Sequence, residues 1–145
     1  MPGLYRIDDR PLDLQDAIRA VAGPDRGAIA TFVGITRNHH DGRSVRFLEY
    51  DAYPEMAEIV LRDIGREVEA RFGTPHIAIL HRIGRLEVGE TSVVVAVAAA
   101  HRREALAACA HAIERVKASA PIWKKEHYAD GAAWIEGSDS VRADG

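Results

Sequence analysis

The chain has 145 residues, of which 47% are hydrophobic and 28% charged, and its formal net charge is −3. These values fit one globular domain with a sizeable core, and they argue against nucleic-acid binding by bulk charge. No apolar run is long enough to cross a bilayer, and we expect no signal peptide. The single cysteine, Cys109, rules out an internal disulfide and fits a reducing cytoplasm.

The first part of the chain alternates a strand, a helix and a strand. Residues 4–7 fit a short strand, and Asp13 is a suitable cap for an amphipathic helix that the Gly23-Pro24 pair ends. Residues 27–34 are rich in alanine and branched side chains, which is typical of a buried strand.

A polar stretch at residues 37–43 separates this strand from another, at residues 45–52. The stretch contains Asp41-Gly42, a dipeptide typical of tight turns. We therefore expect the strands 27–34 and 45–52 to form a hairpin with a basic, polar tip.

A second helix is predicted to begin at Pro54, which suits the first turn of a helix. Strands follow at residues 76–83 and 91–99, joined by a turn-rich connection at residues 84–90. The helical periodicity predicts a buried face made of Met56, Ile59, Val60, Ile64, Val68 and Phe72.

A third helix is predicted at residues 101–118, and it must end before Pro121 because proline disfavours helix at the preceding residue. After this bend, Ile122 and Trp123 are expected to form an apolar anchor in an extended segment. The apolar stripe of the helix is predicted to contain Leu106, Cys109, Ile113 and Val116.

The last predicted elements are a loop at residues 126–131 and a strand at residues 132–136. We expect residues 1–136 to form a single domain, and the polar tail at residues 137–145 to be flexible. The mixture of elements predicts an α+β fold with three main helices and a mixed or antiparallel sheet.

Two arginines, Arg102 and Arg103, fall in the first turn of the third helix, where the helix dipole disfavours cations. Either both point into solvent, or an anion such as phosphate binds the helix N-terminus with His101 and Arg102 as donors. The sequence alone leaves both interpretations of the helix start open. The basic tip at residues 37–43, taken by itself, is interpreted as a solvated turn.

Lysines flank the bend at Pro121. Lys117 could serve only the helix dipole, and Lys124 and Lys125 could serve only to protect a strand edge. Lysines near other cations and apolar walls also lose proton affinity, and can then act as bases, nucleophiles or phosphate clamps. The histidines lack the spacing of metal ligands, so we predict a site without metal.

A series of short motifs covers the chain from about Gly27 to Glu136. In chain order, the motifs are Ala30-Thr31-Phe32-Val33-Gly34, Arg37-Asn38-His39, Leu48-Glu49-Tyr50, Tyr53-Pro54 with Met56, His81-Arg82-Ile83-Gly84, Ala100-His101-Arg102, Ala120-Pro121-Ile122-Trp123-Lys124-Lys125-Glu126, Asp130-Gly131 and Trp134. Each motif alone is weak, whereas the ordered set is specific. Together the motifs resemble the large, catalytic subunit of molybdopterin synthase.

The resemblance implies an α/β hammerhead fold and a cytoplasmic sulfurtransferase of molybdenum cofactor biosynthesis. The enzyme would convert cyclic pyranopterin monophosphate into molybdopterin by installing two dithiolene sulfurs. The sulfur would come from the thiocarboxylated Gly-Gly tail of a small ubiquitin-like subunit. Two large subunits would form a homodimer within a heterotetramer, and neither a metal nor another cofactor would be needed.

The resemblance assigns catalytic roles to Lys117 and Lys124. Some members of the family carry a basic residue where this chain has Gly137 and Ser138, and either Arg142 replaces it or the site does without it. The substrate-binding positions implied by the resemblance are Thr36, Arg37, His101, Arg102, Lys125 and Glu126.

The alternative function is a non-catalytic module that binds the small subunit or a phosphorylated ligand. Only 6% aromatic residues and a negative net charge disfavour a nucleotide or RNA binder. Fifteen helical residues separate Arg102 from Lys117, about 22 Å along the axis. We therefore expect a composite site, with His101 and Arg102 supplied by the partner in a two-fold dimer.

Overall fold

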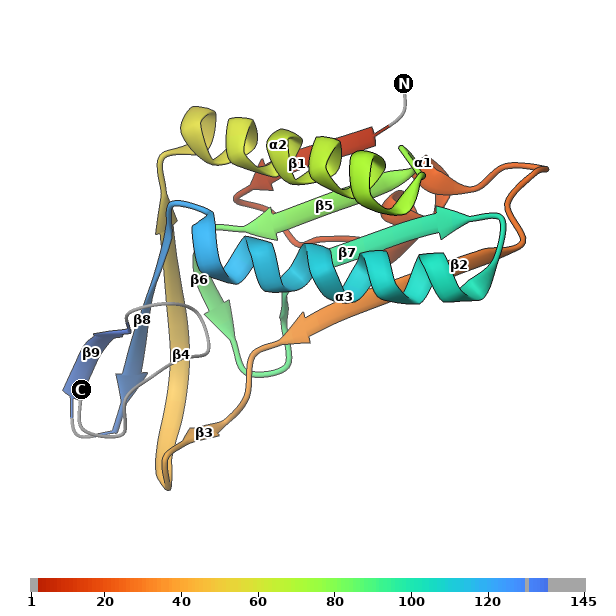
Figure 1. Cartoon of the computed structure of the whole chain (residues 1–145). Helices are drawn as coiled ribbons and strands as arrows, with labels where there is room; N and C mark the ends of the chain where they lie inside the picture. The colour runs from red at the N-terminus through yellow and green to blue at the C-terminus, as the bar shows by residue number, and fades with distance from the viewer. Residues whose placement is uncertain (1–2, 130, 136–145) are drawn as a thin grey trace.

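The computed structural model describes residues 3–129 and 131–135, which form two sheets and three helices (Figure 1). The predicted tail at 137–145, with Gly137, Ser138 and Arg142, lies outside the described residues. The elements in chain order are β1 (Gly3–Asp8), α1 (Leu14–Val21), β2 (Ala28–Ile35), β3 (His39–His40), β4 (Arg43–Ala52), α2 (Pro54–Phe72), β5 (Ile77–Arg82), β6 (Gly84–Glu87), β7 (Thr91–Ala99), α3 (Arg102–Ser119), β8 (Ile122–Tyr128) and β9 (Gly131–Ile135).

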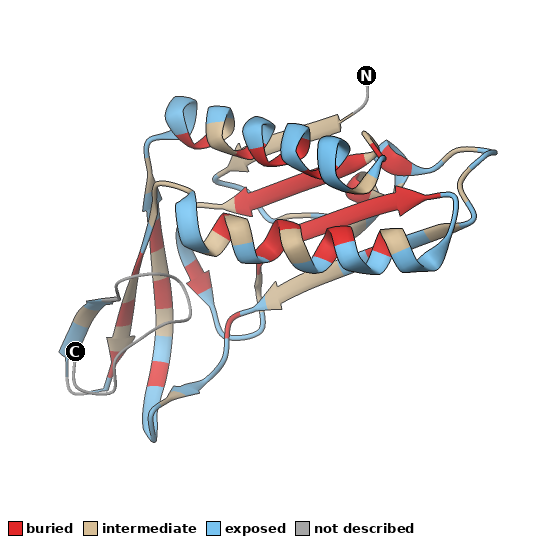
Figure 2. Cartoon of the chain, viewed as in Figure 1, coloured by how far each residue is buried: buried red, intermediate tan, exposed pale blue. Residues whose placement is uncertain are grey.

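The first sheet has the strand order β1-β5-β7-β2. Strands β1 and β5 run parallel, whereas β7 is antiparallel to both β5 and β2. The two central strands, β5 and β7, are buried along most of their length (Figure 2). Their continuous apolar sequences follow from this burial, because both faces of the sheet are covered.

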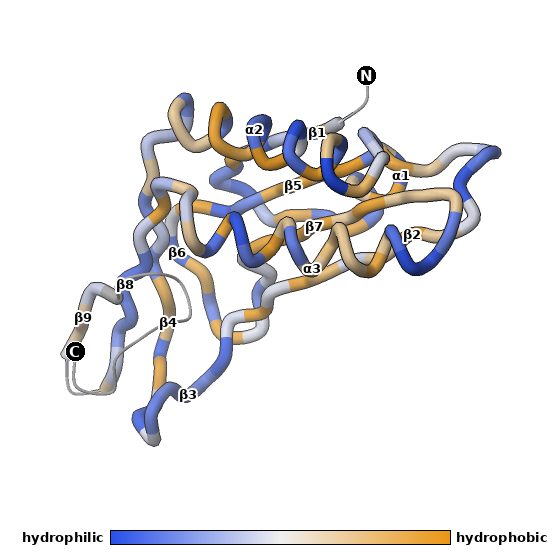
Figure 3. The backbone as a smooth tube through the Cα atoms, viewed as in Figure 1, coloured by the Kyte–Doolittle hydropathy of each residue, from blue (hydrophilic) through white to orange (hydrophobic). Residues whose placement is uncertain are grey.

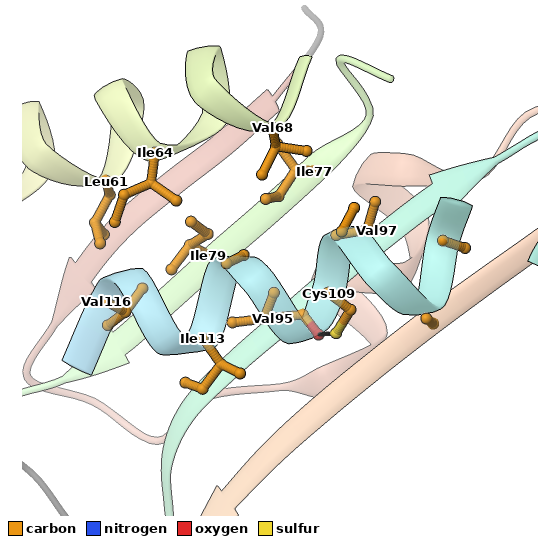
Figure 4. Close-up of a cluster of buried hydrophobic side chains, with 14 of the residues drawn as sticks. Leu61, Ile64, Val68, Ile77, Ile79, Val95, Val97, Cys109, Ile113 and Val116 are labelled. Atoms are coloured by element: carbon orange, nitrogen blue, oxygen red, sulfur yellow. Dashed lines mark hydrogen bonds between the residues drawn. The ribbon is translucent and has the colours of Figure 1, made fainter. Parts of the chain in front are cut away.

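Helices α2 and α3 cover one face of this sheet and pack against each other (Figure 1). Alternate residues of β5 and β7 point to this face, as the two-residue repeat of a strand requires. Figure 4 shows the resulting core, with side chains from both helices and both strands in contact. Its labelled members are Leu61, Ile64, Val68, Ile77, Ile79, Val95, Val97, Cys109, Ile113 and Val116.

Helix α1 covers the opposite face, where small side chains let the helix approach the sheet. The Asp13 carboxylate accepts a hydrogen bond from the Gln15 backbone N–H at 2.9 Å, so the predicted N-cap is confirmed. This second core contains Ala17, Val21, Ala78, Leu80, Val94, Ala96 and Ala98.

The second sheet has the order β3-β4-β8-β9, with β6 also paired to β4. Its tip near β3 is hydrophilic (Figure 3), whereas its inner face has a small core of its own. The buried members of that core are Val45, Leu48, Tyr50, Leu86 and Tyr128.

The predicted long hairpin between residues 27–34 and 45–52 is wrong. Asp41 and Gly42 do form a turn, with φ angles of 52° and 77°, but it joins β4 only to the two-residue strand β3. Strand β2 pairs with β7 in the first sheet, and β4 pairs with β8 in the second. The chain changes sheets between β2 and β4, which a local turn signal does not report.

Two helix faces also differ from the prediction. Met56 and Ile59 are both 58% exposed, and the buried face of α2 includes Ala57 and Leu61 instead. On α3, Leu106 is exposed, while the other members of the predicted stripe are buried. The apolar residues of both helices exceed what one buried stripe can hold, so periodicity alone assigned some of them to the wrong face.

Two predicted connections contain strands of the second sheet. The expected turn-rich connection at 84–90 contains strand β6, and the expected loop at 126–131 overlaps the second half of β8 and the first residue of β9. The predicted α+β class with mixed sheets is nevertheless confirmed. Among the described residues, no helix is long and apolar enough to span a membrane.

Candidate functional site

The bend at Pro121 joins two of the elements that form the site. The Ala120 N–H still donates to the Val116 carbonyl, but Ala120 itself is extended, so α3 ends there. Strand β8 begins at Ile122. Only two residues therefore separate the last turn of α3, which carries Lys117, from the strand that carries Lys124.

Strand alternation divides β8 into two faces. Lys124, Glu126 and Tyr128 are buried on the inner face, whereas Trp123 and Lys125 point to the outer one. On the neighbouring strand β4, Tyr50 lies opposite Lys124 and Leu48 lies opposite Glu126. The inner face therefore combines charged groups with aromatic and aliphatic neighbours.

Lys124 and Glu126 form a buried ion pair. Their side chains approach to 3.5 Å between Nζ and Oε2, and the two residues are only 8% and 3% exposed. The Tyr128 hydroxyl donates to Glu126, and His40 Nδ1 lies 4.0 Å from the same carboxylate. Glu126 is thus enclosed by partners, which suits a group that orients Lys124 better than one that binds substrate directly.

Arg37 joins this cluster through His40. Its Nη2 lies 3.3 Å from His40 Nδ1, which itself faces Glu126. The basic tip predicted at residues 37–43 therefore reaches back toward β8, and is more than a solvated turn. Arg37 remains exposed, so its guanidinium is accessible to a ligand.

His81 and Tyr50 lie between Lys117 and the cluster around Lys124. His81, at the end of β5, lines a small cavity together with Lys117 and Ile122, and its ring meets the Tyr50 ring edge-on at 5.0 Å. Burial lowers the pKa of His81 to about 4, and the Lys117 charge acts in the same direction. Burial likewise raises the pKa of Tyr50 to about 12, so both rings are uncharged near neutral pH.

Two predicted residues, Trp123 and Lys125, have other surroundings. Trp123 lies in the extended segment that was predicted, but it is 44% exposed and packs edge-on against Tyr53. Lys125 lies over the Trp134 ring on the outer face, away from Lys124. Strand alternation explains both positions, because neighbouring residues of β8 must face opposite ways.

Thr36 is buried directly after β2, against the turn between β6 and β7. Its N–H donates to the Glu90 carbonyl, and its own carbonyl accepts from Gly89, both at 2.9 Å. Its hydroxyl is buried and makes no hydrogen bond within the described residues. The backbone role of Thr36 is thus evident, whereas its predicted contact with substrate remains a prediction.

His101 and Arg102 lie at the opposite end of α3 from Lys117 (Figure 1). They line an open depression together with Arg103 and Leu106, on the first turn of the helix. Within one chain, the structure therefore brings together Lys117, Lys124, Glu126 and Arg37, and it separates them from His101 and Arg102.

Sequence reasoning gave no role to His40, Tyr50, His81 or Tyr128. A signal was present for Tyr128, because the spacing Lys124, Glu126, Tyr128 fits one face of a strand. The other three come from β3, β4 and β5, and their positions depend on strand pairing over long sequence distances.

The fold and the site together define an α+β protein with a buried, lysine-centred polar site at the junction of two sheets. The MoaE protein family model matches residues 7–119, and the chain belongs to this family. The curated molybdopterin synthase catalytic subunit of Halalkalibacterium halodurans is 44% identical over 131 residues, which cover 90% of this chain and 84% of that protein.

Solved structures agree with this assignment. Molybdopterin synthase from Staphylococcus aureus superposes with a TM-score of 0.86 at 36% identity, over 90% of this chain and 95% of that one. A complex of subunits 1 and 2 of molybdopterin-converting factor from Helicobacter pylori has the same fold, with a TM-score of 0.73 at 22% identity over 92% and 90% of the two chains. The comparisons confirm the predicted family and, with it, the predicted class of enzyme, the catalytic subunit of a molybdopterin synthase.

Proposed function

We propose that this chain transfers sulfur from the thiocarboxylated Gly-Gly tail of a small ubiquitin-like subunit to cyclic pyranopterin monophosphate, and so forms the dithiolene of molybdopterin. One observation carries the proposal: Lys117 and Lys124 reach one region from two elements, and Lys124 is held there by the buried carboxylate of Glu126. Family membership supports the reaction class.

Each group has a chemical role in this proposal. The ammonium groups of Lys117 and Lys124 stabilise the anionic thiocarboxylate and the negative charge that develops during acyl and sulfur transfer. Arg37, exposed beside the cluster, binds the phosphate of the pterin. Glu126 and Tyr128 hold Lys124 in place, as the buried ion pair and hydrogen bond suggest.

His101 and Arg102 enter the same site from a second copy of the chain. The length of α3 supports this arrangement, because its 18 residues extend about 27 Å and keep the two ends apart. A two-fold homodimer brings the start of one α3 beside the end of the other. With one small subunit bound to each large subunit, the assembly is a heterotetramer. A cytoplasmic location agrees with the single, buried cysteine, Cys109.

The direct test combines the purified chain, thiocarboxylated small subunit and cyclic pyranopterin monophosphate, and measures molybdopterin. Wild-type protein should form product, and Lys117→Ala should lower the rate by at least about tenfold. Arg115→Ala is the matched control on the same helix, because Arg115 faces α2 and pairs with Glu67 at 3.3 Å. Tight binding of the small subunit without product would instead identify a non-catalytic module.

A further inference from the structure

His81 is a buried polar residue at the junction of the two sheets, and it has no part in the proposed chemistry so far. It is 4% exposed, and its Nδ1 lies 2.8 Å from the Arg82 carbonyl oxygen. A carbonyl only accepts hydrogen bonds, so Nδ1 carries the proton. The second ring nitrogen, Nε2, therefore presents a lone pair.

The His81 ring and Lys117 share a small cavity. The cavity holds about 20 Å³, room for one water molecule at most, and both side chains line it. Its remaining walls are apolar and come from β7, α3 and the bend that follows α3. They are formed by Val93, Ile113, Val116, Ala120 and Ile122.

Besides Lys117 of α3, the charged and titratable groups near this space come from three strands. Strand β5 supplies His81, β4 supplies Tyr50, and β8 supplies Lys124 and Glu126. Lys117 is the charged side chain whose field acts on His81, whereas Glu126 acts on Tyr50. Both rings are uncharged near neutral pH, so they act on their surroundings as dipoles.

We propose that His81 is a positioning residue for Lys117: Nε2 accepts a hydrogen bond from Nζ, directly or through one water, and so orients the amine into the site. The inference rests on the proposed function for the importance of Lys117. The cavity that His81 and Lys117 share is an observation independent of that function. An acceptor at this position favours the charged form of the amine. His81 thereby helps to keep Lys117 protonated.

Two amide substitutions separate this role from simple packing. His81→Asn can still donate to the Arg82 carbonyl, but it has no atom at the position of Nε2. His81→Gln is longer and supplies an amide oxygen as acceptor near that position. Both variants bury one amide, so they are matched in polarity, and circular-dichroism melts select conditions in which both are folded.

The ionisation of Lys117 is the primary measurement. The chain contains three lysines, Lys117, Lys124 and Lys125, so carbon-13 NMR of labelled lysine side chains resolves each titration after assignment by Lys→Arg variants. We expect His81→Asn to lower the pKa of Lys117 by about one unit and the product rate by about tenfold. His81→Gln should stay within about twofold of wild type in rate.

Equal Lys117 titrations in wild type and His81→Asn would overturn the inference, whatever the rates. Equal rates in the two amide variants would overturn it as well. A failure of the proposed function looks different, because Lys117→Ala would then form product at the wild-type rate while the NMR titration still decides whether His81 contacts the amine.

Discussion

Lys124 and Glu126 are a buried ion pair, and such pairs react sharply to the loss of one partner. Lys124→Met should abolish product formation, and it should also destabilise the protein by about 3 kcal/mol because Glu126 keeps a buried charge without its cation. Urea unfolding and the product assay measure the two effects separately.

The double variant Lys124→Met with Glu126→Gln is the control. Removing both charges should restore most of the stability, since the remaining amide can still accept from Tyr128. The double variant should stay inactive. Activity in this folded double variant would show that Lys124 matters for stability alone.

His81 links stability to pH at the same junction. Its pKa is about 4 in the folded protein, against about 6.5 in an unfolded chain, because burial disfavours the charged ring. The contribution of neutral His81 to the free energy of unfolding is therefore complete above about pH 6.5, and it is lost as the pH falls toward 4. Between pH 7 and about pH 4.5, the wild type should lose about 2 to 3 kcal/mol more than His81→Gln does.

Urea titrations of both proteins at the two pH values test this difference, and carboxylate effects common to both cancel. Parallel losses in the wild type and in His81→Gln would mean that the native ring is protonated at acid pH without cost, contrary to its burial.

Single residues were predicted unevenly. The resemblance assigned Lys117, Lys124 and Arg37, and the structure brings these three into one region. His81 and Tyr50 lie between them, yet the sequence did not indicate this proximity. It depends on the pairing of β5 with β7 and of β4 with β8. Long-range strand pairing is not encoded in a local window.

At the scale of elements, the ends of helices were easier to predict from the sequence than their buried faces. Pro121 fixed the end of α3, and Asp13 fixed the start of α1, because each acts through its own backbone or side chain. The face of α2 was wrong at Met56 and Ile59, since the helix extends past the first sheet and its apolar residues exceed the buried stripe.

Two substitutions on α2 test its orientation. Leu61 is fully buried against β5 and α3, so Leu61→Ala should cost about 2 to 5 kcal/mol of unfolding free energy. Ile59 is exposed, so Ile59→Ala should change it by no more than about 0.5 kcal/mol. Thermal or urea unfolding of the two variants measures this, and a large loss for Ile59→Ala alone would reverse the assigned faces.

The predicted hairpin failed for a reason that belongs to the whole sheet. A turn at Asp41-Gly42 exists, but β2 had a stronger partner in β7, whose apolar residues complete the first core. The neighbouring strands in sequence therefore separated into different sheets. Competition among partners decides such pairings, and a single sequence does not rank them.

For the whole molecule, the residues with proposed functional roles lie at both ends of α3. If sites are shared between two copies, inactive Arg102→Ala and inactive Lys124→Met should complement each other. In an equal mixture, half of the dimers are mixed and each has one intact site of two, so about a quarter of the wild-type activity should return.

The mixture of Lys117→Ala with Lys124→Met is the matched control, because both changes lie in the same half-site and no intact site can form. Subunit exchange is verified by native mass spectrometry of differently tagged chains. Exchange without recovered activity would contradict shared sites.

The two-residue connection between α3 and β8 has a consequence for how this chain can change in evolution. Insertion or deletion of one residue between Lys117 and Lys124 would exchange the two faces of β8, and would bring Trp123 or Lys125 to the inner side. A change in the length of the exposed turn at Asp41-Gly42 would not exchange the two faces of β8. We therefore expect functional descendants to vary in length at that turn while keeping the spacing between the two lysines unchanged.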